Sequence, residues 1–143
     1  MNKKKRFVNG FTNWLFSEYK APRIPVKVMY KCEAIVDDGS KCSGYFGYDN
    51  EELVILVAAK KLGLTKCLFV IAHEFTHYMQ YLNHRDMSEK EIIEEDAYYY
   101  EVPLVGKYLY NKRKKDTKIT GVLDITIPMR TRLIQAEALQ EDP

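Results

Sequence analysis

The sequence predicts an α+β fold with an N-terminal helix, a small antiparallel or mixed sheet, and two consecutive helices joined by a short connection. Apolar residues recur at helical spacing before residue 20, residues 26–58 are β-rich, and a second helical pattern runs from residue 66 to about 103. A chain of 143 residues, with 46% hydrophobic and 29% charged residues, is long enough to bury one core. We expect a single domain over residues 1–143.

The N-terminal helix is predicted by an apolar stripe with a period close to 3.6 residues. Prolines disfavour helical backbone at the residue before them, so the helix should end before Pro22 and Pro25. A stripe of this kind is expected to pack into the core. It consists of Phe7, Phe11, Trp14, Leu15 and Tyr19.

The sheet is predicted from three β-rich segments separated by turn residues. Residues 26–36 lead into the turn Asp37–Ser40, and residues 44–48 look like their antiparallel partner. Residues 53–58 form a continuous apolar run. This run is either a buried core strand or an edge strand to which an extended peptide could add.

The three cysteines are expected to be free thiols. If Asp38-Gly39 is the hairpin turn, Cys32 lies opposite Tyr45 rather than opposite Cys42, which argues against a cross-strand disulfide. A structural zinc site would need two more ligands besides Cys32 and Cys42, and Cys67 is the remaining cysteine.

Residues 66–87 contain no glycine or proline and follow Thr65, which is a plausible N-cap. Two seams run along this predicted helix, and at about 100° per residue they point largely away from each other. Histidines with a packing role alone would more naturally share the apolar seam. The apolar seam contains Leu68, Ala72, Phe75, Met79 and Leu82, and the polar seam contains His73, His77, Gln80 and His84.

The polar seam includes the pentapeptide His73-Glu74-Phe75-Thr76-His77, an H-E-x-x-H pattern. Residues four apart lie on the same helix face, so both imidazoles can reach one metal ion, for which zinc is our expectation. Glu74 can reach a water at the same site and act as the general base. The same pentapeptide can also occur by chance on an ordinary helix.

The third ligand is expected from the next helix, where the available carboxylates are Glu94, Glu95, Asp96 and Glu101. Ser88–Glu91 is a capping box that predicts a helix from about residue 89, and the short connection 83–88 suits a helical hairpin. Glu94 is the first choice for the third ligand and Glu95 the second. Ala97, on the face of Glu94, would let the two helices approach closely.

His84 is an alternative third ligand, although no glycine precedes it to turn the helix back. A peptidase also needs a donor that stabilises the oxyanion of the transition state. Tyr98, Tyr99 and His84 are the candidates, and the sequence does not choose among them.

The helix from residue 89 should stop or kink at Pro103. Beyond it, residues 119–127 suggest a strand, and Pro128 suits the first turn of a last helix. The apolar residues of that last helix are Leu133, Ile134 and Leu139.

The net charge of +2 is unevenly distributed. Basic runs lie at residues 3–6 and 112–115, and an acidic run lies at 89–101. The basic runs favour solvated surface over nucleic-acid contact, so we expect no direct nucleic-acid binding. No apolar run approaches the roughly 20 residues that cross a membrane, and no signal peptide is evident, so we expect a cytoplasmic protein.

An H-E-x-x-H helix followed by a short hairpin and a helix carrying Glu94-Glu95-Asp96-Ala97 resembles the ImmA/IrrE metallopeptidases. The resemblance covers roughly residues 26–103 and includes the small sheet before the helix. It implies a zincin-like fold, a zinc ion, and the first glutamate of the second motif as the third ligand. This chain departs from the family at Thr76, where glycine is frequent, and at the tyrosines 98–100.

The resemblance implies a zinc-dependent endopeptidase acting on intracellular proteins of bacteria or of mobile elements such as phages. A separate helix-turn-helix repressor is one candidate substrate. The alternative is a non-proteolytic regulatory or partner-binding protein that keeps the zincin fold and the zinc site. The SprT-like group shares H-E-x-x-H but expects a further histidine downstream, and none follows His84.

Overall fold

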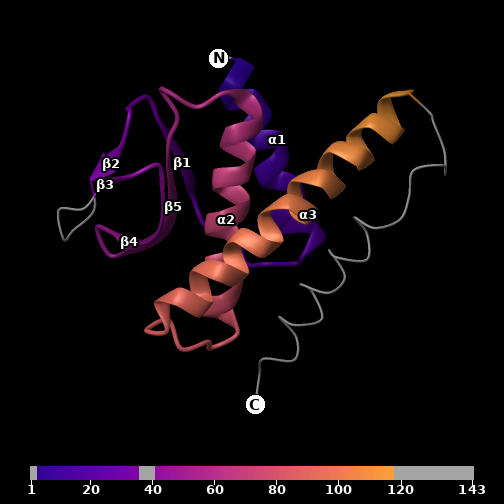
Figure 1. The fold of residues 1–143 in the computed structure, drawn as a ribbon. Coiled ribbons are helices and arrows are strands. Elements are labelled where there is room, and N and C mark those ends of the chain that lie inside the picture. The colour runs from indigo at the N-terminus through magenta and orange to yellow at the C-terminus, as the bar shows by residue number, and fades with distance from the viewer. Residues whose placement is uncertain (1–2, 36–40, 118–143) are drawn as a thin grey trace.

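The computed structural model describes residues 3–35 and 41–117, which fold into three helices and two small sheets (Figure 1). The predicted α+β class is therefore confirmed for these residues, whereas a single domain over 1–143 stays a prediction. The predicted strand 119–127 and the helix from Pro128 lie outside the described residues. The elements are α1 Lys3–Glu18, β1 Val26–Met29, β2 Ala34–Ile35, β3 Lys41–Cys42, β4 Gly44–Asp49, β5 Glu52–Ala58, α2 Leu64–Leu82 and α3 Lys90–Thr117.

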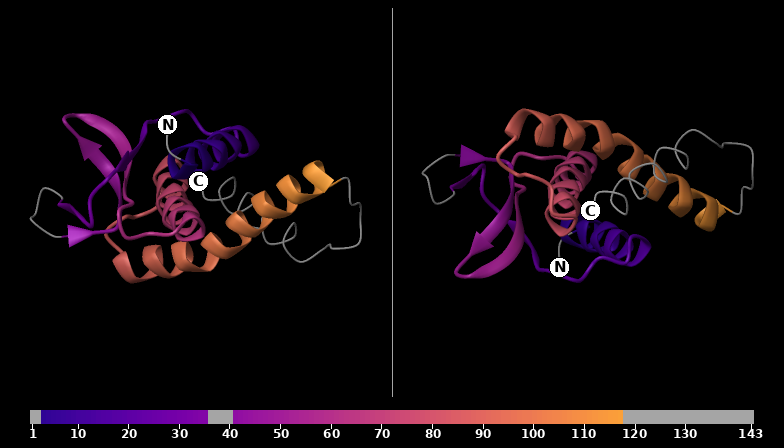
Figure 2. Two further views of the ribbon diagram at one scale, coloured as in Figure 1. Left: turned by 90° about the horizontal axis from the view of Figure 1, so that it is seen from above. Right: turned by 90° about the horizontal axis from the view of Figure 1, so that it is seen from below.

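Helix α2 occupies the centre of the fold, with the sheet on one side and α1 and α3 on others (Figure 2). The predicted N-terminal helix is confirmed as α1, and its apolar stripe enters the core, where Phe11 and Leu15 are fully buried. On the facing side of α2, Leu68 and Phe75 are also buried. The core thus forms where α1, α2 and the sheet meet.

The principal sheet has the strand order β1-β5-β4 and is mixed. β5 pairs in parallel with β1, where Val26 lies opposite Ile55, and antiparallel with β4, where Gly44 lies opposite Val57. The predicted turn between β4 and β5 is present, and Asn50 and Glu51 both have positive φ, as a tight two-residue hairpin turn requires.

The predicted pairing of residues 26–36 with residues 44–48 is wrong. β1 ends at Met29 and joins β5, and a separate two-stranded sheet pairs β2 with β3, with Ala34 opposite Cys42. Cys32 therefore does not lie opposite Tyr45, which pairs with Leu56. None of the three cysteines forms a disulfide, as expected. The turn at residues 37–40 lies outside the described residues.

β5 is the central strand, so the suggestion that residues 53–58 form an edge strand is also wrong. Ile55 and Val57 belong to the helix-facing core, while Val54 and Ala58, which alternate with them, are buried too. An unbroken apolar strand is typical of a strand that is buried on both faces and paired on both edges. The strand at the edge beside α2 is β4.

Helix α2 begins one residue before Thr65, which is therefore not the N-cap; Gly63 holds that position without a side-chain hydrogen bond. The helix ends at Leu82, although no glycine or proline follows at once. The Asn83 side chain donates to the carbonyl of Met79 at 2.8 Å, and His84 adopts a positive φ of 60°. These local bonds satisfy the last carbonyls and turn the chain.

Helix α3 starts at Lys90, close to the predicted position, but not with the predicted capping box. Ser88 Oγ donates instead to the carboxylate of Asp86. The helix also does not stop at Pro103 but continues to Thr117. A proline inside a helix costs about 3 kcal/mol, and here the burial of neighbouring residues offsets this cost. The buried neighbours are Tyr100, Leu104, Val105 and Tyr108.

Among residues 3–35 and 41–117, no helix combines the length and the apolar character needed to cross a membrane.

Candidate metal centre

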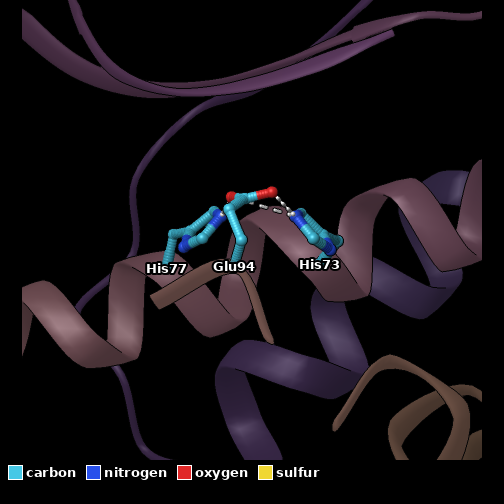
Figure 3. A group of neighbouring side chains, drawn as sticks. All are labelled: His73, His77 and Glu94. Atoms are coloured by element: carbon cyan, nitrogen blue, oxygen red, sulfur yellow. Dashed lines mark hydrogen bonds and ion pairs between the residues drawn. The ribbon is translucent and has the colours of Figure 1, made fainter. Parts of the chain in front are cut away.

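His73, His77 and Glu94 come together between α2 and α3 (Figure 3). The two histidines lie one turn apart on α2, and Glu94 lies in the first turns of α3. One ligand atom from each residue lies within 4.8 Å of the others, so the three side chains could hold a metal ion. Both histidines are buried, with 8% of each residue exposed, whereas Glu94 is exposed. The site is thus open toward solvent on the Glu94 side.

The Glu94 carboxylate lies between the inner nitrogens of the two imidazoles. His73 Nε2 is 3.2 Å from Oε2, and His77 Nε2 contacts Oε1. The rings lie nearly perpendicular, with centroids 4.8 Å apart. Both Nε2 atoms therefore face the same point.

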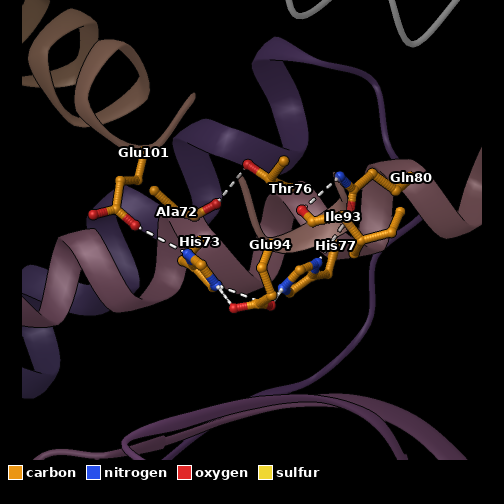
Figure 4. Close-up of polar contacts among 8 residues, drawn as sticks. All are labelled: Ala72, His73, Thr76, His77, Gln80, Ile93, Glu94 and Glu101. Atoms are coloured by element: carbon orange, nitrogen blue, oxygen red, sulfur yellow. Dashed lines mark hydrogen bonds and ion pairs between the residues drawn. The ribbon is translucent and has the colours of Figure 1, made fainter. Parts of the chain in front are cut away.

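The outer nitrogen of His77 is held by Gln80 (Figure 4). His77 Nδ1 lies 2.9 Å from Gln80 Oε1, and Gln80 Nε2 donates to the carbonyl of Ile93 at 3.2 Å. A backbone carbonyl can only accept a hydrogen bond, so the amide nitrogen must face Ile93 and the amide oxygen must face the histidine. His77 therefore donates through Nδ1, and in the neutral imidazole this leaves a lone pair on Nε2.

The outer nitrogen of His73 is held by Glu101, one of the acidic residues of α3. His73 Nδ1 is 3.0 Å from Glu101 Oε2, and the Glu101 side chain is only 20% exposed. An ionised carboxylate accepts hydrogen bonds and donates none. His73 therefore donates through Nδ1, and in the neutral imidazole this leaves the Nε2 lone pair available to a metal ion.

These hydrogen bonds make the inner face of the site a set of electron-pair donors. In neutral imidazoles the two Nε2 lone pairs and the Glu94 carboxylate converge on one point, and a cation bound between them would stabilise this arrangement. A bound metal ion satisfies this arrangement, and outer hydrogen bonds to carboxylate and amide oxygens are the usual partners of histidine ligands. Two imidazoles and one carboxylate leave a further coordination position for water, as catalytic zinc sites do.

Glu74 is buried next to the histidines, with 8% of the residue exposed. Burial, and then the negative charges of Glu94 and Glu101, raise the pKa of Glu74 from 4.5 to about 8. A carboxyl with a pKa near neutrality can both accept and release a proton. A cation at the site would favour its ionised, proton-accepting form.

Strand β4 passes close to Glu74. A Cβ built on Gly44 would lie 3.0 Å from Glu74 Oε2 and 2.5 Å from Val70 Cγ1, so only glycine fits there without displacement of these side chains. The close approach places the outer edge of the sheet beside the general-base candidate.

The other candidates are placed less centrally. Glu95 is exposed and not part of the metal-binding group, and His84 is exposed beyond the end of α2. Tyr98 lies near the site: the centroids of its ring and of the His73 ring are 4.6 Å apart in an edge-on arrangement. The Tyr98 side chain is exposed. Tyr99 packs against Tyr100 instead. Of the three oxyanion-donor candidates, Tyr98 is the one whose ring contacts a histidine of the site.

The sequence placed Gln80 on the polar seam without a role of its own and offered Glu101 only as one of the carboxylates available for the third ligand; in the structure both hold a histidine instead. Gln80 follows His77 by three residues on the same helix face, and Glu101 follows Glu94 by seven residues, which is two helical turns. The proposed close approach of the helices at Ala97 agrees with its full burial.

Comparisons with models of protein families, with curated proteins and with solved structures gave no match to this chain. What the site can do therefore rests on its own donors, charges and geometry.

Proposed function

We propose that this chain is a zinc-dependent endopeptidase of the zincin type, related to the ImmA/IrrE metallopeptidases. The observation that carries the proposal is the convergence of two imidazole Nε2 atoms and a carboxylate, with a buried glutamate directly after the first histidine. His73, His77 and Glu94 are the proposed ligands. Zinc is favoured because two histidines and one glutamate are a ligand set of zinc peptidases.

In this function, zinc supplies Lewis-acid chemistry for water activation and for carbonyl polarisation. Glu74 accepts the proton of the attacking water and passes it to the leaving amine. Gln80 and Glu101 keep the two imidazoles in one tautomer and orientation throughout. The buried walls around Glu74 limit access of bulk water to the proton that it holds.

The sheet supports a peptide substrate rather than a small molecule. β4 is hydrogen-bonded to β5 on one side, and in the part of the chain that is described no strand pairs with its other edge. That edge begins at Gly44, beside Glu74. An extended peptide could donate and accept main-chain hydrogen bonds along it, which would place one of its carbonyls near the general base.

The metal assignment is tested by zinc analysis of the wild-type protein beside Glu94→Ala and Glu95→Ala. These neighbouring glutamates are both exposed residues of α3, but only Glu94 contacts the histidines. We expect Glu94→Ala to lose most of its zinc and Glu95→Ala to keep it. Equal zinc content in the two variants would refute the ligand set.

The reaction is tested separately with Glu74→Gln, which is expected to bind zinc but not to cleave. A mixed peptide library analysed by mass spectrometry serves as substrate, because the natural target is not fixed by the site. Cleavage by the wild type that is absent from Glu74→Gln supports the peptidase. Zinc binding without cleavage of peptides or of candidate repressors would favour the non-proteolytic regulatory alternative.

A further inference from the structure

The two basic runs, far apart in sequence, lie at the same end of the fold. The run 3–6 opens α1, and Lys112 lies in the last turns of α3. Lys112 Nζ lies 5.0 Å from the centroid of the Phe7 ring, directly after the first run. Further along, Lys107 Nζ is 2.7 Å from Glu18 Oε2, near the other end of α1. The C-terminal half of α3 therefore lies across α1, and its basic residues lie near the start of α1.

A third basic segment joins them at the loop between β5 and α2. Lys4 Nζ donates to the carbonyl of Ala59 at 2.9 Å, and Lys60 and Lys61 follow at once. The backbone N–H of Lys60 donates to the carbonyl of Lys31 at 3.0 Å. The residues that follow β1 therefore lie beside the loop between β5 and α2. Both lysines after Ala59 are exposed.

Two helix N-termini add to the positive potential. α1 and α2 both begin at this end of the fold (Figure 1), and neither has an acidic residue in its first turn. A helix N-terminus carries a partial positive charge. It therefore repels the positive side chains in the first turns, which are Lys66 in α2 and the run 3–6 in α1. An anion bound at this end would relieve that repulsion.

Residues 3–17, 59–73 and 102–113 contain no aspartate or glutamate. We define the basic pole by the basic residues that these segments place at one end: Lys3, Lys4, Lys5, Arg6, Lys60, Lys61, Lys66, Lys112 and Arg113.

An exposed aromatic ring borders the basic pole. Tyr30 is 77% exposed, and Lys60 Nζ lies 5.8 Å from the centroid of its ring. Lysines spread over several segments suit a ligand with repeating negative charges, such as a phosphate backbone. An exposed aromatic ring beside them provides a surface on which a base can stack. Contrary to the expectation from the basic runs in the sequence, which the fold brings together, we propose that the basic pole binds single-stranded nucleic acid, with its lysines along the phosphates and Tyr30 as a stacking platform.

An anionic membrane fits these observations less well. A helix that lies on a bilayer needs an exposed apolar face beside its basic residues. The apolar face of α1 is already used, because Val8, Phe11 and Leu15 are fully buried in the core.

The basic pole is separate from the metal centre. Lys66 precedes His73 by seven residues on α2, which is about 10 Å along the helix axis at 1.5 Å per residue. Nucleic-acid binding therefore does not depend on the proposed peptidase function.

The test measures the fluorescence anisotropy of a labelled oligothymidylate as the full-length chain is added at several salt concentrations. We expect Lys60→Gln/Lys112→Gln to bind more weakly and to reduce the salt slope by about 1.4, at roughly 0.7 for each lost phosphate contact. Tyr30→Ala should weaken binding about fivefold or more. The matched control is Lys20→Gln/Lys90→Gln, which removes the same charge from exposed positions at the end of α1 and the start of α3.

Several results would overturn the proposal. These are no binding by the wild type at low salt, equal loss in the control pair, or preferential binding to anionic lipid vesicles. Duplex DNA bound as tightly as the single strand, together with full binding by Tyr30→Ala, would refute the single-strand assignment. Glu74→Gln and chelator-treated protein should bind the oligonucleotide like the wild type, so failure of the peptidase proposal would leave this result unchanged.

Discussion

Removal of Glu101 should weaken metal binding although Glu101 is not a proposed ligand. The substitution Glu101→Leu deletes the acceptor that lies 3.0 Å from His73 Nδ1. The His73 ring then loses the bond that fixes its tautomer and orientation. Loss of such an outer hydrogen bond typically costs 10- to 100-fold in metal affinity, or about 1.4–2.8 kcal/mol.

The stability of the metal-free protein should respond differently. Glu101 is one of the two negative charges that raise the pKa of Glu74, so its removal also relieves repulsion within the site. The lost hydrogen bond and the relieved repulsion act in opposite directions. We therefore expect a small change in the Tm of the metal-free protein and a clear fall in the Tm increase that zinc produces.

The assay is competition for zinc with a chromophoric chelator at neutral pH, accompanied by thermal unfolding with zinc and with chelator. Glu101→Gln is the conservative variant, because its amide oxygen can still accept from His73 Nδ1, and it should retain more affinity than Glu101→Leu. Glu95→Ala is the control for loss of an exposed carboxylate on the same helix. Wild-type zinc affinity in Glu101→Leu would refute the role of Glu101 in orienting His73 for metal binding.

Three further substitutions test the frame of the site. Gln80→Leu removes the acceptor of His77 Nδ1 and the donor to the Ile93 carbonyl, so chelator competition should show roughly 10-fold weaker zinc binding, and an unchanged affinity would contradict the tautomer assignment. Gly44→Ala places a Cβ against Val70 and Glu74, so denaturant unfolding should show a free energy of unfolding lower by about 1–3 kcal/mol. Peptide cleavage should fall while zinc is retained. Full activity would show that β4 does not set the position of Glu74. Ala97→Leu adds volume at a fully buried position of α3, so the free energy of unfolding should fall by about 1–3 kcal/mol in the same experiment. The zinc content should fall as well, because α2 and α3 can no longer approach as closely. A wild-type zinc content would contradict this prediction.

Local sequence patterns were sufficient to locate the helices, because helical periodicity and helix-breaking residues are short-range signals. The stripe through Phe11 and Leu15 located α1, and the opposed seams located the buried and the metal-facing sides of α2. Boundaries were less well determined, as the cap at Gly63 shows. At Pro103 long-range packing outweighs local preference. Burial of the neighbouring residues stabilises the helix beyond a proline that would normally end it.

Strand pairing could not be read from the sequence because it depends on which edges meet in three dimensions. The turn residues 37–40 favoured a hairpin of the two segments that flank them. In the fold, β1 instead pairs in parallel with β5, and only β2 and β3 pair across that connection. The unbroken apolar character of β5 was the available signal for a strand with neighbours on both edges.

The sequence alone determined the chemistry that this chain offers: two histidines one turn apart, a glutamate between them, and carboxylates on the helix that follows. These facts follow from helical geometry, which fixes neighbours within a few residues. Only the tertiary structure decided that Glu94 rather than Glu95 faces the histidines, that Gln80 and Glu101 fix their tautomers, and that the distant basic runs form one pole. The physical reason is that these contacts join different elements, and the packing of α1, α2 and α3 against one another sets them.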